Sequence, residues 1–212
     1  MTAPAFPAEY DERPAEAPRG RVVLLNGTSS SGKSSIAAEL LRVLDGPWFH
    51  VPLDAFHRMR SDRDIAPEDL QAEIDRTARG FHRAAAGMAA AGNNIVVDHV
   101  LTRRWRLLEC LELFTARDVT LVGVRCPLPE LERRERERGD RGSVAARQFP
   151  LVHAHGVYDI ECDTSIADPA ACARAIAEFL PVRPLPTAFQ RLRREYAVGA
   201  SAIPRPAATG GR

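Results

Sequence analysis

The sequence predicts an α/β protein in which a parallel sheet of about five strands carries helices on both faces. Short apolar runs alternate with longer stretches whose apolar residues recur at helical spacing. Strands that alternate with helices in this way pair in parallel. The apolar runs are nearly continuous, as in strands that helices cover on both sides. The first run is followed at once by a glycine- and serine-rich turn and a helix.

The expected elements lie between residues 20 and 181, which we take as one domain. The expected strands are Arg21–Asn26, Trp48–Asp54, Asn94–Val100, Val119–Cys126 and Tyr158–Thr164. The expected helices are Ser34–Leu44, Pro67–Ala91, Arg103–Ala116, Pro129–Arg138 and Asp168–Leu180. In the first helix, Ile36, Leu40 and Leu44 share one face. The second helix opens on Pro-Glu-Asp and ends near Gly92, which are typical start and stop signals.

The two ends of the chain differ in composition from this domain. Residues 1–19 carry four prolines and few apolar residues, which is typical of a disordered tail. Residues 182–212 form a second tail that is rich in proline, alanine and arginine. Within it, Phe189, Leu192 and Tyr196 recur at helical spacing and predict a short helix over 187–198 that docks on the domain.

Composition and charge argue against several classes of partner. A formal net charge of +1 disfavours nucleic acid and acidic membranes as partners. No apolar run approaches the roughly 20 residues that a membrane helix needs, and the N-terminus lacks the apolar core of a signal peptide. The four cysteines show neither a CxxC pair nor metal-like spacing. We therefore expect them to be small buried side chains in a reducing cytoplasm.

The stretch GTSSSGKSS, from Gly27 to Ser35, predicts a nucleotide site. It contains the pattern G-x-x-x-x-G-K-[ST] between an expected strand and an expected helix, which is the context that a phosphate-binding P-loop requires. Its backbone N–H groups and the helix N-terminus can surround phosphate oxygens. The residues expected to contact the nucleotide are Gly27, Thr28, Ser29, Ser30, Ser31, Gly32, Lys33, Ser34 and Ser35.

Lys33 is the only lysine in the chain, although Lys and Arg together number 29. A compact ammonium on a thin stem can enter between the β- and γ-phosphates of a nucleotide. A guanidinium is a wide planar fork and would need a different loop. This difference in shape explains why the one lysine stands in this position.

Two aspartates follow expected strands and are candidates for the chemistry. The Ser34 hydroxyl is expected to bind Mg²⁺, and Asp98 at the end of an apolar strand is the expected carboxylate partner. Asp54 follows the second strand and can act as the base that takes a proton from an acceptor hydroxyl. The alternative for Asp54 is an N-cap of a helix that begins at Ala55. For His99, the alternatives are a core residue and a contact to the substrate.

Arginines and acidic residues alternate from Arg133 to Gly142 and end in a Gly-Asp-Arg-Gly break. A solvated helix with i,i+4 ion pairs accounts for Arg133 and Glu137. Arg138 and Arg141 border glycines, so we expect them to belong to a short lid that closes over the phosphates.

The ordered motifs LNGTSSSGKSS, LDAF, VVDHV, VGVRC, RERERGDR, QFPLVH and GVYDIECDTS resemble the chloramphenicol phosphotransferase-like family of small P-loop kinases. The resemblance spans roughly Val22 to Leu180. It implies a P-loop kinase fold and ATP-dependent phosphorylation of the primary hydroxyl of chloramphenicol, which inactivates this antibiotic. It also implies that Asp54 is the base and that Arg138 and Arg141 are lid arginines. Where the type member has two carboxylates, this chain has Asp98 and His99.

Two alternatives to a chloramphenicol kinase stay open. One is a P-loop kinase of another hydroxyl acceptor, such as a nucleotide-sugar, a nucleoside or a polyol, because the segment after Asp54 is polar and arginine-rich whereas an aromatic substrate prefers an apolar wall. The other is a nucleotide-binding switch without catalysis. A switch should lack a positioned base and a lid, and this chain offers Asp54 and two arginines for these roles.

The shape argument for Lys33 predicts that even a conservative substitution is harmful. Lys33→Ala should remove most turnover while the fold survives, and Lys33→Arg should also turn over poorly because the guanidinium does not fit the loop. Turnover rates, with circular dichroism as the control for folding, check this prediction. Near-normal turnover of Lys33→Arg would contradict the steric explanation.

Overall fold

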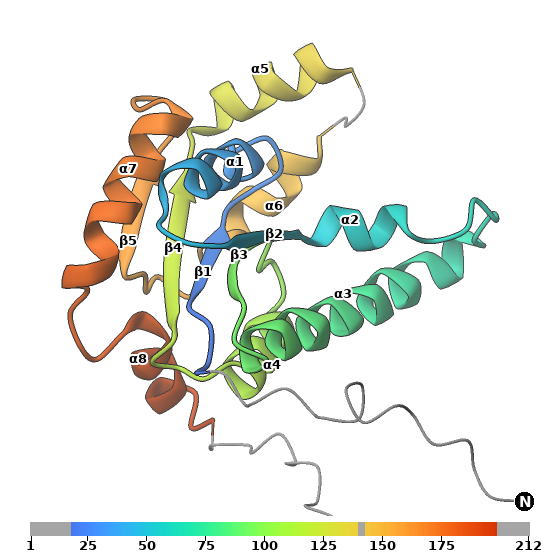
Figure 1. The fold of residues 1–212 in the computed structure, drawn as a ribbon. Helices are drawn as coiled ribbons and strands as arrows, with labels where there is room; N and C mark the ends of the chain where they lie inside the picture. Colours follow the sequence, from blue (N-terminus) through green and yellow to red (C-terminus); the bar gives the residue numbers. More distant parts are fainter. Residues whose placement is uncertain (1–17, 140–142, 199–212) are drawn as a thin grey trace, which may run out of the picture.

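A computed structural model describes residues 18–139 and 143–198 of the chain. Its centre is a five-stranded sheet with the order β2-β3-β1-β4-β5, in which every neighbouring pair is parallel (Figure 1). The strands are β1 (Val22–Asn26), β2 (Trp48–Pro52), β3 (Asn94–His99), β4 (Val119–Arg125) and β5 (Ile160–Asp163). The predicted parallel α/β fold is therefore confirmed.

Helices follow the strands in the order that the sequence predicts, with three additions, two α-helices and one 3-10 helix. The helices are α1 (Lys33–Val43), α2 (Leu53–Arg58), α3 (Pro67–Ala90), α4 (Arg104–Leu113), α5 (Leu128–Arg138), α6 (Val144–Val152), α7 (Pro169–Phe179), the 3-10 helix η2 (Leu180–Val182) and α8 (Ala188–Glu195). Within residues 18–139 and 143–198 we find no helix with the length and apolarity of a membrane span.

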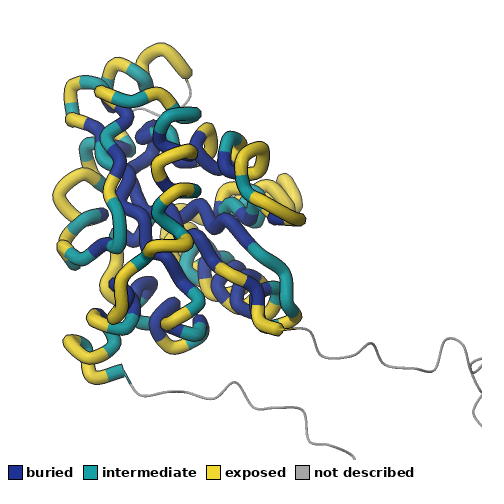
Figure 2. Tube along the Cα trace, turned by 60° about the vertical axis from the view of Figure 1, so that its left-hand side comes forward, coloured by how far each residue is buried: buried dark blue, intermediate teal, exposed yellow. Residues whose placement is uncertain are grey.

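The apolar side chains of the central strands alternate between two cores, one on each face of the sheet. Val22 and Leu24 of β1 pack with α3, α4 and α8, whereas Val23 and Leu25 pack with α1 and α7. Side chains that point alternately to opposite faces explain this division. Figure 2 shows the resulting buried centre beneath a more exposed outer layer. All four cysteines are buried and free, as expected.

Two α-helices, α2 and α6, are absent from the list of expected helices, although the alternative for Asp54 included a helix that begins at Ala55. The second strand ends at Pro52 rather than at Asp54, and α2 begins at Leu53 with Pro52 as its N-cap. The alternative in which Asp54 caps a helix beginning at Ala55 is therefore wrong. Helix α6 contains Pro150, a residue that normally ends a helix, and this hid its helical pattern.

The C-terminal segment contributes α8 to the core. Phe189 and Leu192 are fully buried there, in the segment where their spacing predicts a docking helix. Thr187 caps α8 by accepting a hydrogen bond from the Gln190 backbone N–H, and the Gln190 side chain accepts one from the Thr187 backbone in return. Residues 1–17 and 199–212, which include most of the first expected tail and the end of the second, lie outside the described residues.

Candidate active site

The candidate site lies where the carboxyl ends of β1, β2 and β3 meet. In a parallel sheet these ends form one edge, and ligands bind in the crevice beside it. Leu25 of β1 and Pro52 of β2 both align with Asp98 of β3. The loop that follows β1, the start of α2 and the Asp98 carboxylate are therefore brought to the same edge.

The loop between β1 and α1 adopts a backbone that needs small residues. Gly32, the N-cap of α1, has φ 89°, and Ser30 has φ 60°. A side chain at Gly27 would place its Cβ 2.6 Å from the Val124 carbonyl oxygen, which leaves no room for one. The two glycines of the motif thus serve different purposes. Gly27 allows close packing against β4, and Gly32 allows the left-handed turn into the helix.

Three hydroxyl groups of this loop are buried without a hydrogen-bond partner among the described residues. They are the Oγ atoms of Ser29, Ser30 and Ser31. A buried polar atom without a partner is costly and usually marks the place of a ligand or water. Hydroxyl donors that gather in a tight loop suit phosphate oxygens, so the loop fits the phosphates of a nucleotide.

Lys33 folds back over the loop. Its Nζ donates a hydrogen bond to the Thr28 carbonyl oxygen at 2.6 Å and lies 3.9 Å from Asp98 Oδ1. The lysine is only 6% exposed and Asp98 only 7%. A buried ammonium in this position is stabilised by the neighbouring carboxylate and remains available to an anionic ligand in the same cavity.

Asp98 is held in its ionised form by groups on three sides. Ser34 Oγ donates a hydrogen bond to Oδ2 at 2.5 Å, and His50 Nε2 lies 3.8 Å from the same oxygen. Burial alone would raise the pKa of Asp98, but the Lys33 ammonium, with His50 and Ser34, brings it below its ordinary value. An ionised carboxylate bonded to a hydroxyl is a pair of hard oxygen ligands, which fits Mg²⁺.

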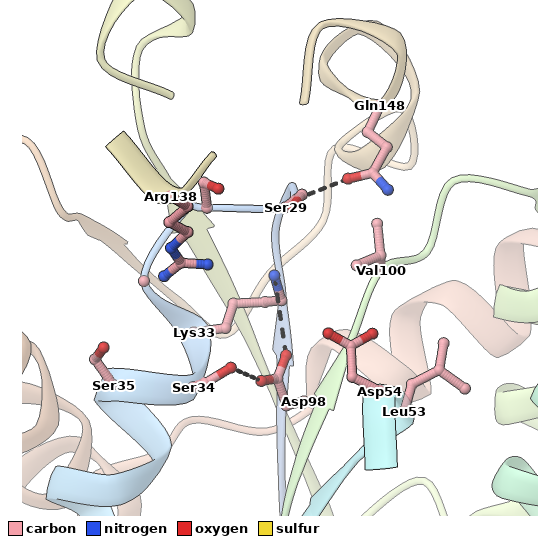
Figure 3. Close-up of a pocket in the computed structure, with 12 residues that line it drawn as sticks. Ser29, Lys33, Ser34, Ser35, Leu53, Asp54, Asp98, Val100, Arg138 and Gln148 are labelled. Carbon is pink, nitrogen blue, oxygen red and sulfur yellow. Dashed lines mark hydrogen bonds and ion pairs between the residues drawn. The ribbon is translucent and has the colours of Figure 1, made fainter. Parts of the chain in front are cut away.

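Asp54 and Arg138 line the same cavity as the loop (Figure 3). In that view the Asp54 carboxylate points into the cavity from the start of α2, and Arg138 approaches from the end of α5. Arg138 therefore lines the cavity in the structure as it stands, although the sequence analysis expected this only after a lid closes. Arg141, the other predicted lid residue, lies outside the described residues.

Two residues at the loop escaped the sequence analysis. The Gln148 side chain of α6 accepts a hydrogen bond from the Ser29 backbone N–H at 2.6 Å. Arg134 of α5 donates to the Thr164 carbonyl oxygen at 2.8 Å and lies 3.4 Å from the Ser30 carbonyl oxygen. Arg134 resembles its neighbours in a charged helix, so no local signal distinguished it. The motif QFPLVH, which contributed to the family resemblance, already contained Gln148.

His99 is a core residue and does not line the cavity of the phosphate loop. Successive side chains of a strand face opposite ways, so Asp98 faces α1 while His99 faces α3. His99 Nε2 lies 2.9 Å from His82 Nε2 of α3 in the fully buried interior. Burial lowers the pKa of His99 well below its ordinary value. The alternative in which His99 contacts the substrate is not supported by this position.

Arg133 forms the ion pairs that the sequence predicts for a solvated helix. Its guanidinium bonds Glu130 and Glu137 on the exposed side of α5. The charged stretch therefore has two sides, because Arg133 meets solvent while Arg134 and Arg138 meet the loop or its cavity.

Comparison with known proteins finds that the chain is similar to phosphotransferases. The family model described as "Chloramphenicol phosphotransferase-like protein" matches residues 20–181. A protein of Mycobacterium tuberculosis strain CDC 1551 with the name "Putative O-phosphotransferase" is 31% identical over 209 residues, which cover 84% of this chain and 90% of that protein. The family that the motifs predict is confirmed, and with it the prediction of a kinase.

Two solved structures with a similar fold are kinases. An APS kinase of Mycobacterium tuberculosis, in complex with AMPPNP and APS, superposes with a TM-score of 0.59 at 18% identity over 77% of this chain and 99% of that chain. A shikimate kinase of Acinetobacter baumannii, in complex with shikimate, gives a TM-score of 0.54 at 13% identity over 78% and 96%. At these identities the likeness establishes the P-loop kinase fold.

Proposed function

Because the chain belongs to the chloramphenicol phosphotransferase-like family, we propose that it transfers the γ-phosphoryl group of ATP to a hydroxyl group of a small molecule. The observation that carries this proposal is the position of Asp54. This carboxylate lines the cavity of the phosphate loop and also a second, larger cavity beside it. A base at the boundary between two cavities can serve a donor in one and an acceptor in the other.

In this proposal the loop and its lysine position the donor. The hydroxyls of Ser29, Ser30 and Ser31 meet phosphate oxygens, and Lys33 moves from the Thr28 carbonyl to the β- and γ-phosphates. Ser34 and Asp98 would hold Mg²⁺, which neutralises charge on the phosphate oxygens when it is bound. The lowered pKa of Asp98 keeps this carboxylate ionised for that purpose at neutral pH.

Asp54 takes the proton of the acceptor hydroxyl as the oxygen attacks the γ-phosphorus. The new bond joins the acceptor oxygen to that phosphorus, and the bond to the oxygen bridging the β- and γ-phosphates breaks, so that ADP leaves. Arg138 stabilises the charge that spreads over the transferred group. Arg141 has the same role by sequence resemblance. The two arginines would thus act by positioning the phosphoryl group and by stabilising its charge, which are the dominant contributions to catalysis of phosphoryl transfer.

The resemblance makes chloramphenicol the first acceptor to test, in which case the reaction inactivates an antibiotic. The larger cavity favours the alternative, an acceptor of different chemistry, because three arginines line it. A nucleotide switch without catalysis is the weaker candidate, since Asp54 and Arg138 both line the cavity of the loop. An ATP-consumption screen of hydroxyl compounds that includes chloramphenicol separates these candidates.

The role of Asp54 predicts a loss of rate without a loss of nucleotide binding. Asp54→Asn should lower kcat by about 100- to 10,000-fold because the amide cannot accept the proton. The affinity for ATP, measured by titration calorimetry, should stay close to that of the wild type. Asp45→Asn, which changes an exposed aspartate that lines neither cavity, is the matched control and should be unaffected. A normal rate in Asp54→Asn would refute the assignment of the base.

The role of Arg138 predicts a separation of rate from stability. Arg138→Ala should lose about 100- to 1000-fold in turnover, as is typical when a stabiliser of transition-state charge is removed. Its melting temperature should stay unchanged, because a surface arginine contributes under about 1 kcal/mol to stability. Arg136→Ala removes another exposed arginine of α5 and should keep full turnover. If both variants turn over normally, Arg138 has no part in the reaction.

A further inference from the structure

The larger cavity lies directly beside the cavity of the phosphate loop. Its volume is about 650 Å³, and it shares Leu53, Asp54, Val100 and Gln148 with the loop cavity. Pockets of about 300–1000 Å³ are the usual size for small organic ligands. A molecule in this cavity can therefore reach Asp54 with a hydroxyl group while its other end lies away from the loop.

Three arginines line this cavity. Arg103 is the N-cap of α4, Arg106 lies in the first turn of that helix, and Arg147 belongs to α6. Among the described lining residues, Asp54 carries the only acidic side chain. The remaining lining includes apolar side chains of Ile74, Val144 and Leu151, which suit a carbon skeleton rather than a second charged group. The cavity thus has positive charge on its walls and one carboxylate at its boundary with the loop.

Arg106 differs from the other two arginines because it is buried, with only 7% of its surface exposed. Its Nε has no hydrogen-bond partner among the described residues. The contacts of its other nitrogens are long, at 3.4 Å to Asp75 Oδ1 and 3.5 Å to the Val100 carbonyl oxygen. An arginine cannot shed its charge in a protein. A buried guanidinium that lacks a hydrogen-bond partner is costly, and an anionic ligand that bound Arg106 would reduce this cost.

Electrostatic repulsion inside the cavity supports the same interpretation. Burial lowers the pKa of Arg106, Asp75 partly opposes this, and the Arg103 guanidinium lowers it further. Burial lowers the pKa of His57, which also lines the cavity; the Asp54 carboxylate opposes this shift and the Arg106 guanidinium adds to it. A negative group between Arg103 and Arg106 would relieve the repulsion between their guanidinium groups. Each guanidinium can bind two oxygens of such a group.

We propose that this cavity binds an acceptor alcohol that carries an anionic group, a carboxylate or a phosphate or sulfate ester. The anion lies on Arg103 and Arg106 while the hydroxyl group points toward Asp54. The inference rests on the proposed function, since it names the class of acceptor for that reaction. It also separates this chain from a kinase of chloramphenicol, because that compound carries no ionised group that three arginines would bind.

The first experiment compares acceptors in matched pairs. Hydroxycarboxylates are paired with their amides, and sugar phosphates and sugar sulfates with the free sugars, so that each source of negative charge has its own arm. ATP consumption should give kcat/KM values about 10- to 100-fold higher for the anionic member of at least one pair, as expected for charge-assisted hydrogen bonds. Equal or better phosphorylation of the neutral members overturns the inference.

The second experiment uses variants on the acceptor found in this way. Arg103 is exposed, so Arg103→Gln should fold normally even if Arg106→Gln does not. It should raise KM for the anionic acceptor about 10- to 100-fold and leave KM for ATP unchanged. Arg104→Gln is the matched control, because Arg104 is also exposed but lies over the Tyr196 ring and does not line the cavity. An unchanged acceptor KM in Arg103→Gln contradicts the proposal.

A binding measurement separates the failure of this inference from that of the proposed function. The Trp105 ring centroid lies 5.5 Å from the Arg106 guanidinium carbon, so Trp48→Phe leaves one reporter tryptophan next to Arg106. With the loop saturated by Mg²⁺ and AMPPNP, sulfate should change its fluorescence saturably, and Arg103→Gln should weaken this binding at least about tenfold. If no alcohol is phosphorylated but sulfate binds in this way, only the reaction is wrong. If sulfate does not bind, the anion site is wrong.

Discussion

The ionised carboxylate of Asp98 is the feature on which the candidate site depends. A buried negative charge is costly unless other groups compensate it. Here the compensation comes from two consecutive residues of α1, since Lys33 supplies the charge and Ser34 the hydrogen bond. The loop before α1 is thereby fixed against β3. These contacts are made by protein groups alone, which favours preorganisation of the loop for phosphate binding.

The position of Asp98 follows in turn from the register of the sheet. Pairing of Leu25 with Asp98 puts both side chains on the face that α1 covers. A shift of one residue would turn Asp98 toward α3 and place His99 at the loop, since side chains alternate along a strand. The apolar residues on both faces of β1 and β3 fix this register. The apolar core that stabilises the fold therefore also orients the Asp98 carboxylate toward α1 and the phosphate loop.

Arginines lie on two sides of the candidate site. Arg134 and Arg138 on α5 lie on the side of the phosphate loop, whereas Arg103 and Arg106 on α4 lie on the far side of Asp54. The single lysine stands inside the loop, where we predict that a guanidinium would not fit. The arginines stand where wider spaces allow a planar fork to meet an anion. The choice between the two cations is thus a matter of space as well as charge.

Much of this arrangement was predictable from the sequence, because its signals are local. The apolar runs fix the strands, the loop motif fixes the phosphate site, and the rule that parallel strands end at one edge brings Asp54 and Asp98 together. The second cavity was not predictable. Its arginines come from different elements and lie in ordinary helical patterns, so only the tertiary packing shows that Arg106 is buried. Gln148 escaped notice for a related reason, since Pro150 obscured its helix.

The most direct test of this account is the dependence of nucleotide binding on Mg²⁺. ADP affinity is measured by titration calorimetry over a series of Mg²⁺ concentrations for the wild type, Asp98→Asn and Asp54→Asn. We predict that Mg²⁺ strengthens binding to the wild type and to Asp54→Asn but has little effect on Asp98→Asn, because Asp98, unlike Asp54, is a proposed ligand of the metal. The same dependence on Mg²⁺ in all three proteins would contradict the central role of Asp98.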